Sequence, residues 1–549
     1  MDAIFAQAQP LLTEGKVFMD WAVAEAAQLE PLAALTCFEL PVVSPALDSL
    51  AEQVQSAAGM DLLTIKYVLV MFLAYPFALV WSMVPGKFLK NLTSAAVGIY
   101  LAQWLFGPSW VNCLISALVA YGIMAVTAPL RFMDGMRHWV VFVFMMSYMT
   151  ASHIYRLYVD YMGWTPDYTG PQMILTIKLT SMAWNYYDGV VCKKRLDAVA
   201  TNKDLPRYKK SAAIGFLDRA IFALPDPIEY LGYCFHPTTF FAGPAFGLRH
   251  YQDSVSGAVF KGEKPSWANR IVAGFLNFLQ GVVFMGAYVW TAANLSPAML
   301  DTPESMAQTD ALSVLKRIAL LVVAQIGAVQ CKYFFAWKVT EGSAVWAGFG
   351  WNSDPKSLSN WNAVEQVRPM EFESATSVQA FSRHWNIHTQ QWLEWYVFRR
   401  VTKAGSLNLL ATYAISAFWH GFYPGYYLFF LSVPLVSELD KRLRKAINPW
   451  FYADAEGNPS AKAVQPRKDR KDLAFVYTCI CWVFVHAHMH VLAVAFRLLD
   501  LNASLAWWSS VHYVAHFVPL AGHVLVTLLW VVGLAGGPKQ KDAAKPKKE

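Results

Sequence analysis

Long apolar windows recur along this chain and limit the folds open to it. A helix needs about 20 apolar residues to cross a bilayer. Since backbone groups in lipid have no water to bond, only helices and closed β-barrels span membranes. We therefore expect an all-α polytopic membrane protein with about eleven transmembrane helices. The windows lie near residues 63–84, 91–107, 109–129, 138–158, 170–190, 270–293, 317–339, 404–420, 422–439, 473–497 and 511–534.

The composition supports a membrane protein. Hydrophobic residues make up 56% of the 549 residues and charged residues only 15%, whereas soluble domains carry about 25% charged residues. This polar surface is too small to cover several soluble domains. The net charge of +7 is concentrated in a few loops, which points to membrane orientation rather than nucleic-acid binding.

Loop charges predict the orientation. Basic residues gather near 87–90, 131–137, 193–210 and 441–471, whereas the loops at 107–109, 159–169, 294–310 and 498–510 are acidic or neutral. With eleven spans and the N-terminus outside, each basic loop falls on the cytosolic side, as the positive-inside rule requires. Lys316 and Arg317 are the exception, and we interpret them as a satisfied snorkelling pair.

We expect three parts in the chain. Residues 1–60 have no secretory signal pattern and predict an amphipathic, lumenal segment. Residues 61–535 form the membrane domain, in which Pro237 and Pro244 break the apolar stretch 228–246 into a re-entrant or interfacial segment.

Residues 536–549 predict a basic cytosolic tail. Lys545 and Lys547 match the dilysine retrieval signal of endoplasmic-reticulum membrane proteins. This predicts residence in that membrane and recognition of the tail by coat proteins.

His420 is the most unusual residue in the apolar windows. It lies within Ala417-Phe-Trp-His-Gly-Phe-Tyr-Pro-Gly425, so its ring should occupy a tight, mostly apolar niche. Ionisable groups within a membrane are functional candidates, and histidine suits proton transfer near neutral pH. We expect His420 to be a general base, with a hydrogen-bonded packing role as the alternative.

A second unusual segment runs from Phe381 to Arg400. Asn386 lies 34 residues before His420, and a re-entrant fold could bring the two side chains together. An asparagine amide can donate to a carbonyl oxygen or orient a substrate group.

These segments resemble the signature pair of the membrane-bound O-acyltransferase superfamily. The pair consists of Trp419-His420-Gly421 and Arg383-His-Trp-Asn-Ile-His-Thr389. The runs Lys178–Gly189, Phe240–Pro244 and Lys332–Lys338 extend the resemblance to its lysophospholipid acyltransferase branch, especially the broad-specificity fungal enzymes. The Phe-Tyr-x-Asp-Trp-Trp-Asn motif usual in the sterol and diacylglycerol branch is absent from this sequence.

The resemblance implies helices around a central reaction chamber and acyl transfer from acyl-CoA, as co-substrate, to a lysophospholipid hydroxyl, at sn-2. No permanently bound cofactor is implied. Acylation of diacylglycerol, a sterol or a protein remains an alternative, and a proton-coupled transporter a remote one. The catalytic histidine maps onto His420 and its partner onto Asn386. Further substrate-binding candidates are Arg383, His384, Trp385, His388, Lys356, Arg399, Arg400, Asn185, Asp188 and Glu229.

The run His486-Ala-His488-Met-His490 looks like a metal cluster. On a helix, positions 486 and 490 share a face, while 488 points roughly the opposite way. Because three histidines on one helix could not then meet one ion, we expect no metal site. Activity lost on dialysis against a chelator and restored by zinc would overturn this expectation.

Overall fold

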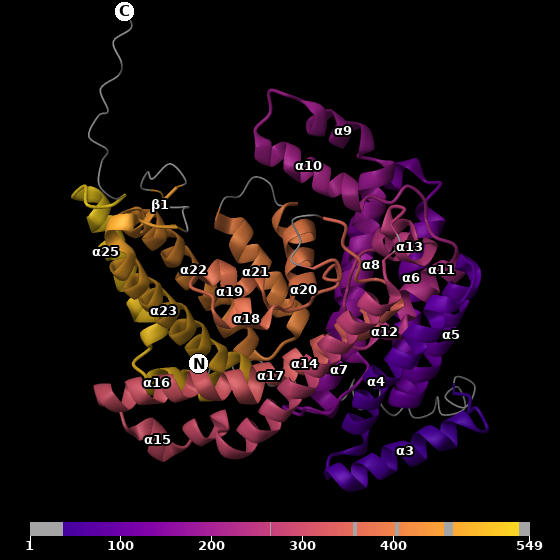
Figure 1. The fold of residues 1–549 in the computed structure, drawn as a ribbon, viewed down its shortest axis with the longest axis horizontal. Coiled ribbons are helices and arrows are strands. Elements are labelled where there is room, and N and C mark those ends of the chain that lie inside the picture. The colour runs from indigo at the N-terminus through magenta and orange to yellow at the C-terminus, as the bar shows by residue number, and fades with distance from the viewer. Residues whose placement is uncertain are drawn as a thin grey trace, which may run out of the picture. The chain divides into compact units, whose positions relative to one another are not determined.

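The computed structural model describes residues 37–263, 265–354, 359–400, 406–454, 460 and 465–536. Helices dominate these residues, and the strands β1 and β2 pair antiparallel over two residues each. Figure 1 shows the helices in chain order. Their bounds are α3 Val43–Ala58, α4 Leu62–Met83, α5 Lys87–Phe106, η1 Gly107–Trp110, α6 Val111–Thr127, η2 Arg131–Met133, α7 Arg137–Val159, α8 Thr169–Val190, α9 Lys193–Thr201, α10 Arg207–Arg219, α11 Pro227–Phe235, α12 Pro237–Phe240, α13 Leu248–Ser256, η3 Ala258–Phe260, α14 Trp267–Asn294, η4 Pro297–Leu300, α15 Pro303–Ala307, α16 Ala311–Gln325, η5 Ile326–Gln330, α17 Cys331–Ala347, α18 Pro369–Glu373, α19 Val378–Arg383, α20 Ile387–Trp392, η6 Leu393–Phe398, α21 Ser406–His420, α22 Pro424–Phe451, β1 Tyr452–Ala453, β2 Gln465–Pro466, η7 Lys468–Arg470, α23 Lys471–Leu498, α24 Leu501–Ser510 and α25 Val514–Val531.

The predicted all-α class is confirmed, and each of the eleven predicted windows is helical over most of its described residues, with residues 404 and 405 lying outside them. Six helical stretches of the described residues are long and apolar enough to cross a membrane. Four of them, Lys87–Thr127, Trp267–Leu300, Ala311–Ala347 and Lys468–Leu498, join neighbouring elements. The helices α7, α8, α21 and α22 lie outside these six. The count of eleven spans, the domain bounds and the orientation therefore stay predictions.

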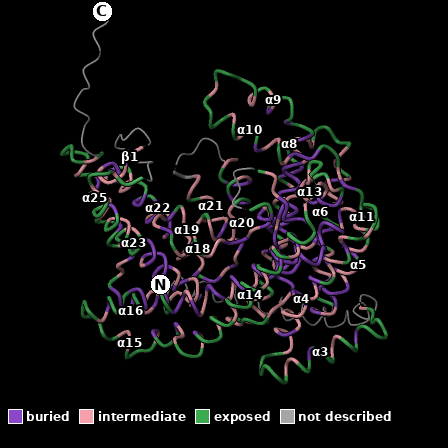
Figure 2. Tube along the Cα trace, viewed as in Figure 1, coloured by how far each residue is buried: buried purple, intermediate pink, exposed green. Residues whose placement is uncertain are grey.

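Exposed apolar side chains mark helix faces suited to lipid. Only 17% of the apolar window of α25 is buried, and exposed residues predominate along it in Figure 2. Phe517, Val524 and Leu528 on this helix are exposed. Exposed apolar area of this extent is typical of a surface covered by a partner or by membrane.

The described chain forms two compact units. The first comprises Met1–Val282 and Ala336–Gln366 within its described residues, and the second Val283–Phe335 and Val367–Glu549. Each has its own buried apolar cluster. Trp81, Phe235 and Phe349 belong to the cluster of the first unit, and Val436, Leu492 and Trp507 belong to that of the second.

The proline-broken stretch 228–246 is confirmed as a broken segment in the first unit. Asp226 caps α11 by accepting hydrogen bonds from the backbone N–H groups of Ile228 and Glu229, at 2.9 and 3.0 Å. The helix ends before His236, and Pro237 begins the four-residue helix α12. Proline suits the first turn of a helix because its missing N–H needs no partner there.

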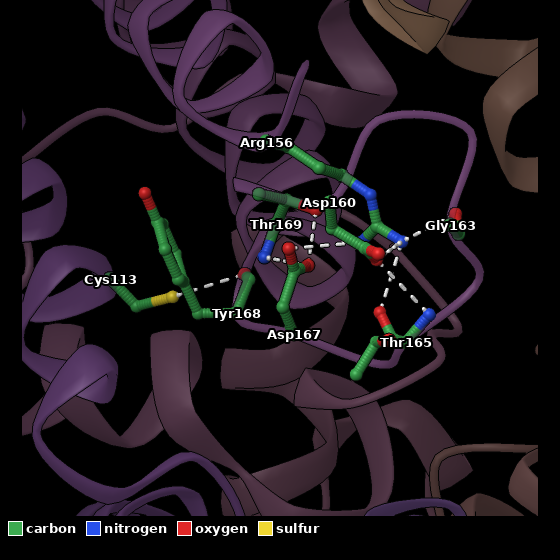
Figure 3. Close-up of polar contacts among 8 residues, drawn as sticks. All are labelled: Cys113, Arg156, Asp160, Gly163, Thr165, Asp167, Tyr168 and Thr169. Carbon is green, nitrogen blue, oxygen red and sulfur yellow. Dashed lines mark hydrogen bonds and ion pairs between the residues drawn. The ribbon is translucent and has the colours of Figure 1, made fainter. Parts of the chain in front are cut away.

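Arg156, at the end of α7, organises the loop that was predicted to be acidic (Figure 3). Its guanidinium lies 2.9 Å from a carboxylate oxygen of Asp167 and 3.6 Å from one of Asp160. It also donates to the backbone carbonyls of Gly163 and Thr165, at 3.3 and 3.0 Å. The two carboxylates of this loop are therefore compensated by one arginine from the preceding helix.

Helix α5 packs directly on the backbone of α11 at Gly98. A methyl group at this position would lie 1.6 Å from the carbonyl oxygen of Phe235, a backbone atom that cannot rotate away. We expect Gly98→Ala to lower the free energy of unfolding by about 1–3 kcal/mol, the usual effect of overpacking.

Thermal unfolding in detergent, followed by tryptophan fluorescence, measures the effect of Gly98→Ala. Gly122→Ala in α6 is the matched control, because a methyl group there meets no atom within 4 Å. Equal unfolding temperatures for both variants would contradict the close packing of α5 on α11.

Candidate active site

His420 is the last residue of α21, in the second unit. The helix stops there because Gly421 adopts φ +126°, a conformation that favours glycine. The N–H of Gly421 donates to the carbonyls of Ala417 and Phe418, each at 3.2 Å, and α22 begins at Pro424. His420 thus lies at the turn between two helices, where the predicted windows 404–420 and 422–439 meet.

Aromatic rings surround the imidazole of His420, and the predicted apolar niche is confirmed. The ring of Phe430 stacks on it at a centroid distance of 5.2 Å, and Phe496 meets it edge-on at 5.0 Å. Tyr426 lies 5.5 Å away. Such packing restricts the orientation of a half-buried imidazole.

A close helix approach places Phe496 beside His420. Gly425, in the first turn of α22, donates its N–H to the carbonyl of Leu499 at 2.8 Å. A Cβ atom on Gly425 would lie only 2.0 Å from the carbonyl oxygen of Ala495. The absence of a side chain at this position therefore lets the end of α23 approach the turn that carries His420.

Asn386 connects α19 to α20 in a left-handed conformation, with φ 45° and ψ 56°. Asparagine is among the few residues other than glycine that adopt this region readily. Its backbone carbonyl accepts from Gln390 at 3.0 Å, but its side chain makes no capping bond to α20. The Asn386 amide is therefore not used to cap the helix and can serve another role.

Trp385 anchors the Asn386 segment within the second unit. Its ring packs 5.0 Å from Phe372 and 5.7 Å from both Tyr333 and Phe334. Trp385, predicted as a substrate-binding residue, is thus embedded in an aromatic cluster. This packing fixes the residue that immediately precedes Asn386.

The segments that carry Asn386 and His420 meet through two tryptophans. Trp392 ends α20, and its ring lies 6.2 Å from that of Trp419, the neighbour of His420. Asn386 precedes Trp392 by six residues, a rise of roughly 9 Å along a helix. The segments that carry these two residues, which are 34 positions apart, therefore contact each other, and α20 and α21 can be followed in Figure 1.

The predicted basic contacts have different surroundings. Arg383 is exposed at the end of α19. Arg399 pairs with Glu394, with Nε 3.0 Å from Oε1, and covers the ring of Trp395 at 4.2 Å. Arg400 donates to the Trp395 carbonyl at 3.3 Å. Glu394 thus balances the charge of Arg399, and Lys356 lies outside the described residues.

The two histidines that flank Asn386 are both partly or fully buried. His384 follows the last residue of α19, and its carbonyl accepts from the N–H of Arg368 at 3.0 Å. Burial, reinforced by the charge of Arg368, lowers the pKa of His384 below its usual value. His388 is buried on α20.

The remaining predicted residues, Asn185, Asp188 and Glu229, belong to the first unit. Asn185 and Asp188 are buried about one turn apart on α8, and the Asn185 carbonyl accepts from the N–H of Ile221 at 3.1 Å. Glu229 accepts a hydrogen bond from the Gln252 amide at 3.1 Å. The structure thus places these three residues in a different unit from His420 and Asn386.

One further cluster cannot be assembled from the sequence. Glu373, His486 and His490 each offer a ligand atom, and these atoms lie within 4.8 Å of one another. Glu373 is 113 positions from His486, and no motif in the sequence relates them. Only the tertiary fold of the second unit shows that they belong together.

Comparison with known proteins adds an independent finding. The sequence profile of the membrane-bound O-acyltransferase family matches residues 154–456. The chain is 27% identical to a lysophospholipid acyltransferase of Schizosaccharomyces pombe, over 81% of this chain and 82% of that protein. It is 26% identical to lysophospholipid acyltransferase 2 of Arabidopsis thaliana, over 85% of this chain and 93% of that protein. It is also 26% identical to human membrane-bound glycerophospholipid O-acyltransferase 2, over 81% of this chain and 79% of that protein.

Proposed function

This chain belongs to the membrane-bound O-acyltransferase family, and we propose that it transfers a fatty acyl chain from acyl-CoA to the free hydroxyl of a lysophospholipid, at sn-2. The observation that carries this proposal is His420, held by aromatic rings at a helix turn beside the segment of Asn386. The proposal also rests on relatives from fungi, plants and animals that are named for acylation of lysophospholipids or glycerophospholipids.

The chemistry needs one base and good positioning. His420 takes the proton of the glycerol hydroxyl as the hydroxyl oxygen attacks the thioester carbonyl carbon. The carbon–sulfur bond then breaks, and the proton passes from His420 to the thiolate of coenzyme A. Because a thioester is already activated, no covalent enzyme intermediate is needed.

Asn386 assists as an amide donor. Its side chain does not cap α20, so its N–H groups can stabilise the negative charge that develops on the thioester oxygen. Such donors act more strongly where water is excluded. Exclusion of water also suppresses thioester hydrolysis.

We further propose the endoplasmic-reticulum membrane as the location, with a cytosolic C-terminus. Acyl-CoA is cytosolic and anionic, so its entrance should be on the side of the basic loops. Arg383, which is exposed next to the Asn386 segment, is our first candidate for a phosphate contact. Lys545 and Lys547, the proposed coat-protein signal, lie outside the described residues.

Acceptor competition tests the proposed substrate. Purified protein in detergent receives labelled acyl-CoA and equal amounts of a lysophosphatidylcholine, a diacylglycerol and a sterol. We expect labelled phospholipid to exceed the other two products by at least roughly 10-fold, because a site built for a polar head group rejects acceptors that leave its polar groups unpaired. Dominant labelling of the diacylglycerol or the sterol would assign the enzyme to another acceptor class.

A further inference from the structure

Glu373, His486 and His490 converge in the second unit from two distant segments. Glu373 ends the short helix α18, and the two histidines share one face of α23, with their rings 5.6 Å apart and nearly parallel. One ligand atom from each residue lies within 4.8 Å of the other two. His488 points elsewhere, with its Nδ1 2.7 Å from the carbonyl of Phe484, as its position between the two histidines predicts.

Five polar side-chain atoms of this cluster are buried, and among the described residues their protein contact is a weak one between the His486 ring and the Ala375 carbonyl. Both carboxylate oxygens of Glu373, both ring nitrogens of His486 and Nε2 of His490 form no hydrogen bond of ordinary geometry with the described residues. Buried polar groups are nearly always bonded, so each exception needs an explanation. Here five such atoms come from the three residues of one cluster.

Gln325 on α16 orients His490 for a ligand. Its side-chain oxygen lies 3.2 Å from Nδ1 of His490, and its amide nitrogen donates to the His490 carbonyl at 3.2 Å. Nδ1 therefore carries the proton, which leaves the Nε2 lone pair directed at the cluster. A second-shell acceptor that fixes the tautomer in this way is the usual environment of a metal-binding histidine.

Trp482 holds Glu373 and His486 together. Its indole N–H donates to the backbone carbonyl of Glu373 at 2.7 Å, and its ring stacks on that of His486 at 4.5 Å. One side chain of α23 therefore fixes both the carboxylate segment and the first imidazole. Such support is what keeps metal ligands in place.

We propose that Glu373, His486 and His490 bind a divalent transition metal of the zinc type. Two imidazoles and one carboxylate form a known zinc ligand set that leaves a fourth position open. Tetrahedral zinc with bonds of 2.0–2.1 Å holds its ligand atoms roughly 3.3 Å apart, so binding would draw these atoms, which lie within 4.8 Å of one another, closer together. Because metal ligands must be deprotonated, Glu373 would bind as its carboxylate.

The metal has a positioning role for the catalytic segments. Through Glu373 it holds the segment that leads to Asn386, where Phe372 packs 5.0 Å from Trp385. Through His490 it holds α23, whose Phe496 contacts the ring of His420. The site therefore connects the segment that packs beside Asn386 with the helix that packs against His420.

Metal analysis of the purified full chain tests the site. The protein is prepared in detergent with a tag that contains no histidine, and its bound metals are measured by inductively coupled plasma mass spectrometry. We expect about one zinc per chain in the wild type and less than roughly 0.1 in Glu373→Gln and His490→Ala. His488→Ala is the matched control and should keep its zinc. Stoichiometric binding of another first-row metal would support the site and correct its metal.

A second measurement covers variants that fold poorly. Wild type stripped by a chelator should unfold at a higher temperature after zinc is restored, and so should His488→Ala, but not His490→Ala. The proposal is overturned if wild type binds no more metal than His490→Ala, or if zinc leaves its unfolding temperature unchanged. Neither readout uses acyl transfer, so failure of the metal site and failure of the proposed function are distinguishable.

Discussion

His420→Ala is expected to lower the rate of acyl transfer to a lysophospholipid by about 10²–10⁴-fold, the usual contribution of a general base. The variant should fold normally, because His420 is only half-buried and is the last residue of α21. Removing the imidazole leaves the neighbouring aromatic rings with a small void rather than an unpaired buried charge. The measurement is formation of labelled phospholipid from labelled acyl-CoA in microsomes, normalised to the amount of protein.

Two controls sharpen the His420 prediction. His420→Gln keeps a hydrogen-bonding side chain of similar size but removes the base, so it should be nearly as inactive as His420→Ala. His488→Ala removes a histidine that points away from the metal cluster and should retain most of the activity. A rate near that of wild type in His420→Ala, at normal expression, would refute the assignment of His420 as the base.

Glu341→Ala is expected to lower the free energy of unfolding by about 3–5 kcal/mol, because it leaves a buried lysine without its partner. Glu341 and Lys338 lie one turn apart on α17, with side chains only 1% and 5% exposed and an N–O distance of 2.7 Å. Glu341 also accepts from the backbone N–H of Gln366 at 2.5 Å. The variant therefore loses both the ion pair and a tether to residue 366.

Unfolding temperature and yield of monodisperse protein in detergent measure the effect of Glu341→Ala. Asp197→Ala is the matched control, since the pair Lys193–Asp197 has a similar distance of 2.6 Å but is about half exposed. Exposed pairs contribute about 0–1 kcal/mol. Equal stability of the two variants would mean that burial adds nothing to the 338–341 pair.

The sequence predicts the helices well because membrane helices are a local property. Each apolar window is helical over most of its described residues, and the break at Pro237 follows from the proline alone. The niche of His420 was predictable for the same reason, since Phe418, Trp419 and Phe422 lie beside it in sequence. The residues that complete the niche, Phe430 and Phe496, come from α22 and α23 and required the fold.

Contacts between distant segments explain what the sequence could not show. Periodicity relates the three histidines of α23, and His488 does point away from the other two. Glu373 could not be considered with them, because nothing in the sequence relates α18 to α23. The pairing of Arg399 with Glu394 was equally hidden, because helical periodicity says little about the π-helical residues Leu393–Phe398.

The left-handed backbone at Asn386 restricts which mutations this position can accept during evolution. Most side chains lose about 1–2 kcal/mol in this conformation, whereas glycine, asparagine and aspartate tolerate it. Of these three, glycine has no side-chain donor, and aspartate would bring a negative charge toward a developing oxyanion. Asparagine alone satisfies both the left-handed backbone and the proposed reaction. The backbone conformation therefore limits the residues tolerated at this position to three, and the need for an amide donor limits them to one.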